Sequence, residues 1–201
     1  MEILLIRHGQ SEADILGVHE GRADYPLTEL GKKQAKRLAC RLNEQCPPDI
    51  IWTSTLKRAS ETATILADEV GCMLMKEPNL MEFNNGVLAG LPREIAATKY
   101  PLPPGGRKPH ERIQNGESEI EFRMRVEMAF SKILAESSAV LRIAIVSHGG
   151  TISNLLRSIL HLPVSTSVKF ATGDTGIHLI KKEDEGLQIV TLNNTEHLYN
   201  Y

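Results

Sequence analysis

Arg7 and His8 follow directly after a short apolar run at residues 3–6, and His148 comes just after a second run at residues 143–146. Both runs are made largely of isoleucine, leucine and valine, which is typical of buried parallel strands. Ligands of open α/β sheets bind beyond the carboxyl ends of such strands. We therefore expect two histidines that lie far apart in the sequence to meet in one crevice.

The residues around these histidines favour an anionic ligand. Arg58 lies in the first turn of a predicted helix, and Gly149 opens the helix that follows His148. The amide groups at a helix N-terminus attract anions, and the planar guanidinium of arginine matches the oxygens of a phosphoryl group. Together with Arg7 and His8, these residues predict a cationic pocket for a phosphoryl group.

His8 is the candidate nucleophile of this pocket. A nearby like charge disfavours protonation, so the arginines favour a neutral imidazole, which can attack phosphorus. The phosphohistidine that forms divides one difficult transfer into two easier steps. The leaving alkoxide needs a proton, and the water that attacks later needs a base. Glu82, in a turn-rich segment after a predicted strand, is the candidate for both roles.

Strand-like and helix-like patterns alternate along the chain, which indicates an α/β fold with a largely parallel sheet. Residues 10–26 form a polar segment, and residues 100–116 are rich in proline and glycine and are predicted to be a loop or lid. Apolar runs predict strands at residues 3–6, 49–53, 73–75, 143–148, 177–180 and 187–190. Helical spacing of apolar residues predicts helices between residues 28 and 47, 56 and 71, 122 and 133, and 152 and 160.

Several motifs follow one another over nearly the whole chain, at residues 5–11, 24–31, 53–59, 80–83, 116–118, 146–150 and 192–198. With them the sequence resembles the phosphoglycerate mutase-like branch of the histidine phosphatase superfamily. The resemblance implies an α/β fold, a three-layer α/β/α sandwich with a mostly parallel sheet and one antiparallel edge strand. It also implies a single histidine phosphatase domain over residues 1–201, with a lid or insertion at about residues 83–118.

The resemblance further implies a metal-independent reaction that needs no cofactor. In that reaction His8 is phosphorylated, Glu82 donates the proton, and three side chains hold the phosphoryl oxygens, namely Arg7, Arg58 and His148. Cationic groups fixed in place for the charge of the transition state then supply most of the acceleration. The residues expected at the substrate-binding site are Arg7, Ser11, Asp14, Glu20, Gly21, Arg22, Arg58, His148 and Gly149.

Asp14 and Glu20 depart from the family pattern. Phosphatases of this branch usually carry an asparagine six residues after the nucleophile and a glutamine before the glycine that matches Gly21. Both replacements exchange an amide donor for a carboxylate, which repels phosphate unless it is paired or protonated. Arg22 is the nearest expected partner, and a rearranged pocket is the hypothesis that follows.

Three functions remain open at this point. Residues 90–117 form a shorter insertion than mutases of this family typically carry, so water can reach the phosphohistidine. Hydrolysis of small phosphomonoesters is therefore preferred, and mutase-type phosphoryl transfer is the alternative. The two carboxylates keep a non-catalytic phosphoryl-binding or interaction module on the same fold as a third interpretation. Four lid residues either recognise a second anionic group on the substrate or only face solvent, namely Arg107, Lys108, His110 and Arg112.

The composition limits the class of protein. The chain of 201 residues can bury a core, and its net charge of −2, with both signs interspersed, is unlike that of a nucleic-acid or membrane-surface protein. No run is long enough to span a bilayer or resembles a signal peptide. The three cysteines lack metal-type spacing and indicate a reducing compartment. We therefore expect a cytoplasmic monomer or homodimer that acts on a small phosphorylated metabolite, with no metal, nucleic-acid or membrane partner.

Overall fold

The apolar runs that precede the two histidines form adjacent strands. In the computed structural model, which describes residues 1–199, β1 (Glu2–Arg7) pairs in parallel with β4 (Arg142–Ser147), and Leu5 lies opposite Ile145. β2 (Ile50–Thr53) and β3 (Met73–Lys76) extend the parallel part beyond β4. The carboxyl ends of these four strands therefore share one edge of the sheet.

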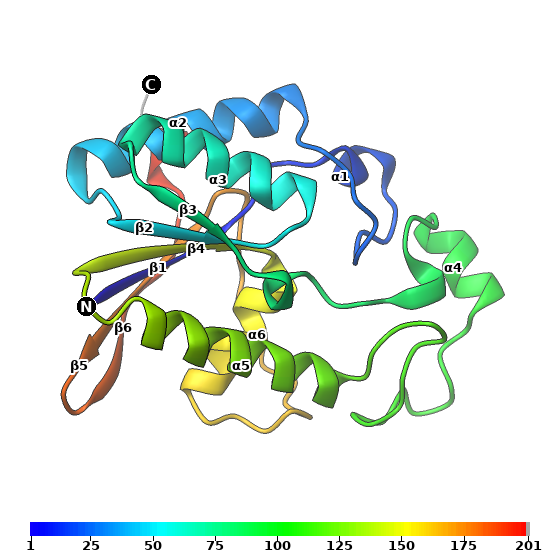
Figure 1. Ribbon diagram of the computed structural model, residues 1–201. Coiled ribbons are helices and arrows are strands. Elements are labelled where there is room, and N and C mark those ends of the chain that lie inside the picture. The colour runs from blue at the N-terminus through cyan, green and yellow to red at the C-terminus, as the bar shows by residue number, and fades with distance from the viewer. Residues whose placement is uncertain (200–201) are drawn as a thin grey trace.

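An antiparallel hairpin completes the sheet. β5 (Ile177–Glu183) pairs antiparallel with β1, and β6 (Gly186–Asn194) pairs antiparallel with β5. The strand order is β3-β2-β4-β1-β5-β6 (Figure 1). The predicted mostly parallel sheet with an antiparallel edge is confirmed, and its antiparallel part is this hairpin.

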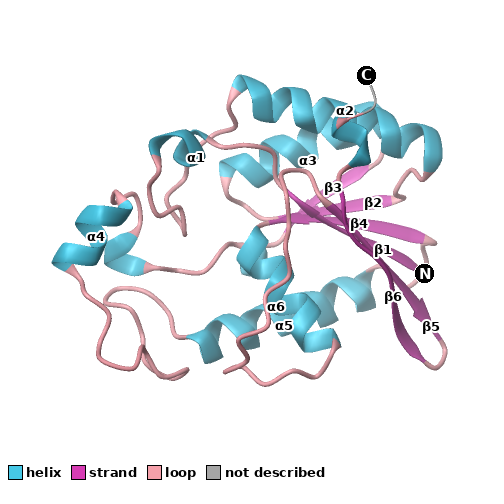
Figure 2. Ribbon diagram, turned by 180° about the vertical axis from the view of Figure 1, so that it is seen from behind, coloured by secondary structure: helices cyan, strands magenta, loops and turns pink. Residues whose placement is uncertain are grey.

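Helices cover both faces of the sheet, which gives the expected three layers (Figures 1 and 2). One face carries α2 (Glu29–Gln45) and α3 (Lys57–Val70), and the other carries α5 (Glu119–Glu136) and α6 (Gly149–Ile159).

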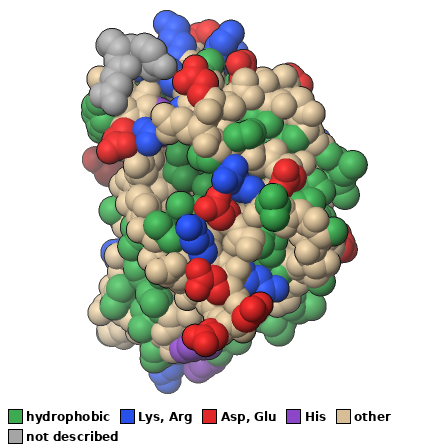
Figure 3. Space-filling model, turned by 90° about the vertical axis from the view of Figure 1, so that its left-hand side faces the viewer, with side chains coloured by type: hydrophobic (Ala, Val, Ile, Leu, Met, Phe, Trp, Pro, Cys, Tyr) green, Lys and Arg blue, Asp and Glu red, His purple; other side chains and the backbone are tan. Residues whose placement is uncertain are grey.

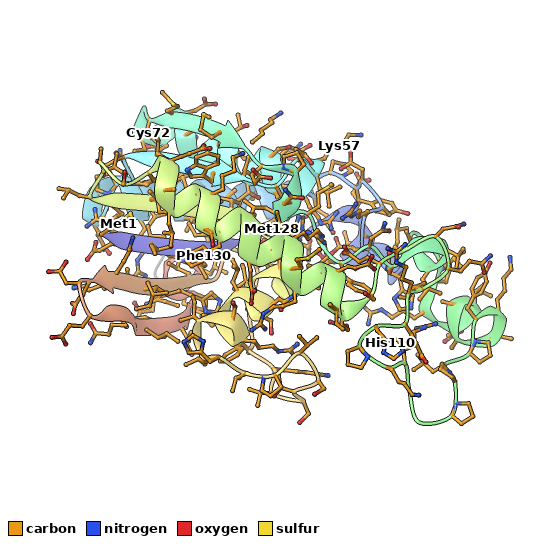
Figure 4. The ribbon with its side chains drawn as sticks, turned by 60° about the horizontal axis from the view of Figure 1, so that its bottom comes forward. Met1, Lys57, Cys72, His110, Met128 and Phe130 are labelled. Carbon is orange, nitrogen blue, oxygen red and sulfur yellow. The ribbon has the colours of Figure 1, made fainter. Side chains whose placement is uncertain are left out.

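Side chains of the central strands alternate between the two layers, as the pleat of a strand requires. In β1, Leu4 and Ile6 pack in the cluster that contains the residues of α2 and α3, whereas Ile3 and Leu5 pack with those of α5 and α6. These strands are apolar on both faces because both faces are covered. The outer helices are amphipathic instead: on α5, Phe130 is buried and Met128 faces outward (Figure 4).

The helix ends follow from local sequence signals. The side chain of Thr28, just before α2, accepts a hydrogen bond from Gly31 N at 2.9 Å, which is a standard N-cap. Helix α3 ends at Gly71, whose φ of 74° is a left-handed conformation that suits glycine. The prediction was wrong at Leu160, which lies just after α6 and is exposed.

Two short helices were not predicted from the sequence. α1 (Glu12–Leu16) interrupts the polar segment after β1, and α4 (Arg93–Lys99) precedes the predicted loop at residues 100–116. Both lie beyond the carboxyl edge of the sheet (Figure 1). Three 3₁₀ turns complete the described elements, at Pro78–Leu80, Gly86–Leu88 and Glu196–Leu198.

Acidic and basic side chains are interspersed on the face shown in Figure 3, with small hydrophobic areas between them. None of the helices within residues 1–199 combines the length and the apolar character that a membrane-spanning helix needs.

Candidate active site

The structure brings the two predicted histidines together. Arg7 ends β1 and His8 follows it, while His148 follows β4 directly and is the N-cap of α6. Because β1 and β4 are neighbours, the two imidazole rings lie edge to face with their centroids 5.1 Å apart. Arg58, in the first turn of α3, completes the predicted group at the same edge of the sheet.

The hydrogen bonds of His8 define which of its nitrogens can react. Nδ1 lies 2.7 Å from the carbonyl oxygen of Gly9, and a carbonyl oxygen can only accept, so Nδ1 carries the hydrogen. Nε2 accepts a hydrogen bond from Nε of Arg58 at 3.2 Å. In the neutral imidazole, Nε2 therefore presents a lone pair toward Arg58.

Both imidazoles are strongly held in the neutral form. Burial and the charges of Arg58 and Arg7 lower the pKa of His8 well below its ordinary value. The same causes, burial first, lower the pKa of His148 well below the ordinary value as well. A neutral imidazole is the form that attacks phosphorus, so the environment matches the predicted nucleophile.

Of the buried side-chain nitrogens that have no partner within residues 1–199, two lie beside His8. Nε2 of His148 hydrogen-bonds with the hydroxyl of Ser54 at 2.8 Å, but its Nδ1 has no hydrogen-bond partner within residues 1–199. Nε of Arg7, beside His8, is equally buried and without a partner in that part of the chain. Buried polar groups are nearly always hydrogen-bonded, so these two atoms indicate a place for an acceptor such as an oxyanion.

Arg7 is positioned by a loop that the sequence analysis did not identify. Its NH1 donates to the carbonyl oxygen of Thr172 at 2.8 Å, and its NH2 lies 3.5 Å from Oδ1 of Asp174 and 3.8 Å from Oδ1 of Asp14. Burial raises the pKa of Asp174. The only sequence signal for this contact is the polar, glycine-containing stretch at residues 172–175, directly before β5.

Gly21, which was predicted to bind substrate, contacts Arg58 through its backbone. Its carbonyl oxygen accepts a hydrogen bond from NH2 of Arg58 at 2.9 Å, and that of Ala23 accepts one from NH1 at 3.0 Å. Gly21 has a φ of 48°, and a Cβ there would lie 1.8 Å from Oδ1 of Asn85. Only glycine allows this close approach.

Glu82 lies at the N-terminus of α6, the helix that begins directly after His148. Oε2 of Glu82 accepts a hydrogen bond from Gly150 N at 2.8 Å, and Oε1 accepts one from Phe83 N at the same distance. Gly150 has to be a glycine, because a Cβ there would lie 2.5 Å from Oε1 of Glu82.

Arg125 on α5 holds the segment that carries Glu82. Its guanidinium donates to the carbonyl oxygens of Asn79, Met81 and Glu82 at 2.7 to 2.9 Å. It also forms two hydrogen bonds with the carboxylate of Glu117. Arg125 was not among the predicted site residues, although Glu117 belongs to one of the motifs.

The predicted partner of the two unusual carboxylates is corrected by the structure. Arg22 lies 3.7 Å from Oε2 of Glu117, not beside Asp14 or Glu20. Asp14 accepts hydrogen bonds from the backbone and hydroxyl of Ser11 and lies near Arg7. Glu20 lies near Arg58 and accepts from the same Ser11 hydroxyl. Arg22 thus pairs with the carboxylate that Arg125 also holds through two hydrogen bonds.

The lid lines an open pocket of about 510 Å³ beside the site. His19, next to Glu20, and Phe83, next to Glu82, line it, together with Arg93 and Arg107. The other lid cations lie elsewhere: Arg112 pairs with Glu121, and Lys108 and His110 are exposed, with His110 in the loop beyond α4 (Figure 4). Of the four lid residues for which two roles were left open, Arg107 lines this pocket, whereas Lys108, His110 and Arg112 do not.

The side chains that could bind a metal ion do not cluster in the described part of the chain. No group of three or more His, Cys, Asp or Glu side chains within residues 1–199 is arranged to hold a metal ion. The three cysteines are half-buried and are not paired with each other.

Comparison with known proteins agrees with this geometry. The family model described as "Histidine phosphatase superfamily (branch 1)" matches residues 3–195. The protein "Probable phosphoglycerate mutase GpmB" of Proteus mirabilis is 32% identical over 98% of this chain and 95% of its own length. "Phosphoserine phosphatase 1" of Hydrogenobacter thermophilus is 30% identical over 98% and 94%. The solved structure of the alpha-ribazole phosphatase from Shigella flexneri superposes with a TM-score of 0.86 at 26% identity, covering 97% of both chains.

Proposed function

The chain belongs to branch 1 of the histidine phosphatase superfamily, and we propose that it hydrolyses small phosphomonoesters through a phosphohistidine on His8. The observation that carries the proposal is a pair of buried nitrogens, Arg7 Nε and His148 Nδ1, which have no partner within residues 1–199 and lie beside a neutral imidazole. A site that binds a phosphoryl group needs donors at such positions, and the neutral imidazole beside them is the form that attacks phosphorus.

In the first proposed step, Nε2 of His8 attacks phosphorus while the bond to the ester oxygen breaks. Arg7, Arg58 and His148 hold the phosphoryl oxygens, with the first amide groups of α6 beside them. As the lone pair of Nε2 is used, the hydrogen bond from Arg58 passes to a phosphoryl oxygen. Glu82 gives its proton to the leaving oxygen, and the alcohol departs.

In the second step, Glu82 takes a proton from a water molecule that attacks the phosphohistidine. The N–P bond breaks, His8 regains its neutral form, and inorganic phosphate leaves. The guanidinium groups and helix amides carry the charge of the transition state in both steps, so the proposed reaction is metal-independent. Ser11, Asp14 and Glu20 form one hydrogen-bonded group beside His8 and Arg58, and Gly149 is the first residue of α6.

The substrate proposed for this site is a small phosphorylated metabolite. The lid at about residues 83–118 contributes the cavity beside Glu82, and its mixture of apolar side chains with Arg93 and Arg107 suits an alcohol that carries a second anionic group. Unpaired cysteines are typical of a reducing compartment, so we place the enzyme in the cytoplasm, as a monomer or homodimer.

Mutase-type phosphoryl transfer is the second candidate. The two arginines of the lid cavity favour it, because they can hold the carboxylate or second phosphate of an acceptor. The relative from Proteus mirabilis carries a mutase name, while the relative from Hydrogenobacter thermophilus is named a phosphatase. The two activities differ in whether water or a second alcohol takes the phosphoryl group.

The test is phosphate release from a panel of phosphomonoesters in the presence of a chelator. The panel contains an activated aryl phosphate, phosphorylated three-carbon acids and phosphoserine, and compares native protein with His8→Ala and a matched His161→Asn variant outside the site. We expect release by native protein and His161→Asn, and none by His8→Ala. Equal release with and without His8 contradicts the proposal and favours a binding module. Transfer between three-carbon acids without release of phosphate identifies a mutase.

A further inference from the structure

A carboxyl group lies against the reactive nitrogen of the site. Oε2 of Glu20 is 4.0 Å from Nε2 of His8, and Oε1 is 3.4 Å from Nε of Arg58. The side chain is 19% exposed, so water screens it only partly. These two nitrogens are the groups that a phosphoryl group has to contact in the proposed reaction, so Glu20 and the substrate compete for one place.

The hydrogen bonds of Ser11 distinguish the two carboxyl groups of the site, Glu20 and Asp14. The hydroxyl of Ser11 lies within hydrogen-bonding distance of Oε1 of Glu20 and of Oδ2 of Asp14. A hydroxyl has one hydrogen to donate, so in the ligand-free site Ser11 can serve only one of the two carboxylates at a time. Asp14 also accepts from the backbone of Ser11 and faces Arg7, which suits the charged form. Glu20 is therefore the carboxylate that we expect to take up a proton when an anion enters.

The charged and titratable groups that face Glu20 come from three elements. Arg7 and His8 lie at the end of β1, Asp14 lies on α1, and Arg58 lies on α3. Burial and the charge of Asp14 raise the pKa of Glu20, and the two arginines and Ser11 oppose the increase only in part. A bound dianion adds further negative charge at short distance and favours the protonated form still more.

We propose that Glu20 binds the phosphoryl group as the neutral carboxylic acid, so that each oxyanion that enters the site takes up one proton. The proton comes from solvent, forms an O–H bond at Oε2 and is donated to a phosphoryl oxygen, while Oε1 continues to accept from Ser11. It returns to solvent when inorganic phosphate leaves. Glu20 thus becomes a donor, as an amide would be at this position, but only when it is protonated.

This inference rests on the proposed phosphoryl site, but its test needs no turnover. Tungstate is a suitable probe, because it is a tetrahedral dianion that does not titrate at neutral or mildly alkaline pH. Titration calorimetry in buffers of different ionisation enthalpy gives the number of protons bound with tungstate. For native protein we expect about one proton, and an affinity that falls about tenfold per pH unit above the pKa of Glu20. For Glu20→Gln we expect no linked proton and a tighter complex than native protein at alkaline pH.

The matched control is Asp174→Asn, which removes the other carboxyl group of the site whose pKa burial raises. It keeps the proton uptake if Glu20 is the source. Uptake that persists in Glu20→Gln overturns the inference, because the proton then goes to a histidine or to Asp174. A pH-independent affinity of native protein also overturns it, because Glu20 then leaves the site as an anion. The pH dependence is measured on native protein, so this test does not depend on whether a variant folds.

The result is distinguishable from failure of the proposed function. Tungstate binding with proton uptake, but no phosphate release from any ester, retains this inference and rejects the phosphatase. Phosphate release that depends on His8, with no proton linked to tungstate binding, retains the phosphatase and rejects the role of Glu20.

Discussion

Nε of Arg58 lies 3.2 Å from Nε2 of His8 and donates a hydrogen bond to it. The other two nitrogens of the same guanidinium donate to the carbonyl oxygens of Gly21 and Ala23. One donor on each of the three guanidinium nitrogens is therefore fixed before a substrate arrives, and the donor on Nε points at the reacting atom. Such preorganisation costs nothing at the moment of reaction, which is why fixed donors are effective in catalysis.

Replacing Arg58 with lysine tests this arrangement. Arg58→Lys keeps a positive charge but has a single nitrogen, which cannot serve His8 and both carbonyl oxygens. We expect kcat for phosphate release to fall roughly a hundredfold or more, the usual loss when one fixed donor to a transition state is removed. The control is Arg41→Lys, at a surface pair with Glu196. Native turnover by Arg58→Lys means that charge alone is sufficient.

Gly150 controls the position of the proposed acid. A Cβ at Gly150 lies 2.5 Å from Oε1 of Glu82, so Gly150→Ala pushes the carboxyl group away from the leaving oxygen. We expect a large loss of turnover on alkyl phosphates and a much smaller loss on an activated aryl phosphate, whose leaving group needs no proton. Gly149→Ala is the matched variant, because its Cβ meets only Arg7 atoms at 3.9 Å. Equal losses on both substrates in Gly150→Ala contradict the role of Glu82.

The meeting of His8 and His148 could be predicted because it depends on backbone topology. Each follows an apolar run, and the ends of parallel strands share one edge of a sheet. Arg58 could be placed for the same reason, since a helix start follows the end of β2. These positions do not depend on where individual side chains point.

The remaining contacts depend on side-chain direction and loop packing, which the sequence pattern does not contain. Arg22 was expected beside Glu20 because they are close in sequence, yet Arg22 pairs with Glu117. Asp174 reaches Arg7 from a loop that carries no periodic signal. Helix α1 was missed because five residues are too few to show a helical period.

Arg107 is the lid residue whose removal is expected to change specificity. It lines the cavity beside the site, whereas the neighbouring Lys108 is exposed. We expect Arg107→Ala to raise KM for phosphorylated acids roughly tenfold or more, the cost of one charge-assisted hydrogen bond, with little change for a simple aryl phosphate. Lys108→Ala is the control and should leave both KM values unchanged. If Arg107→Ala affects both substrates equally, the cavity does not recognise a second anionic group.

The buried histidines predict a loss of stability in mild acid. Burial lowers the pKa of His8 and His148 well below the ordinary 6.5, and it lowers the pKa of His178 and His197 to about 4. Below pH 6.5 the unfolded chain therefore binds protons that the folded chain cannot bind, so this stability is present above pH 6.5 and is lost as pH falls toward the folded pKa values. Thermal unfolding should show Tm falling below that pH, with a shallower slope in His178→Gln and an unchanged slope in the exposed His110→Ala. A Tm that stays level through this range would mean that the histidines gain protons in the folded protein, in conflict with their burial.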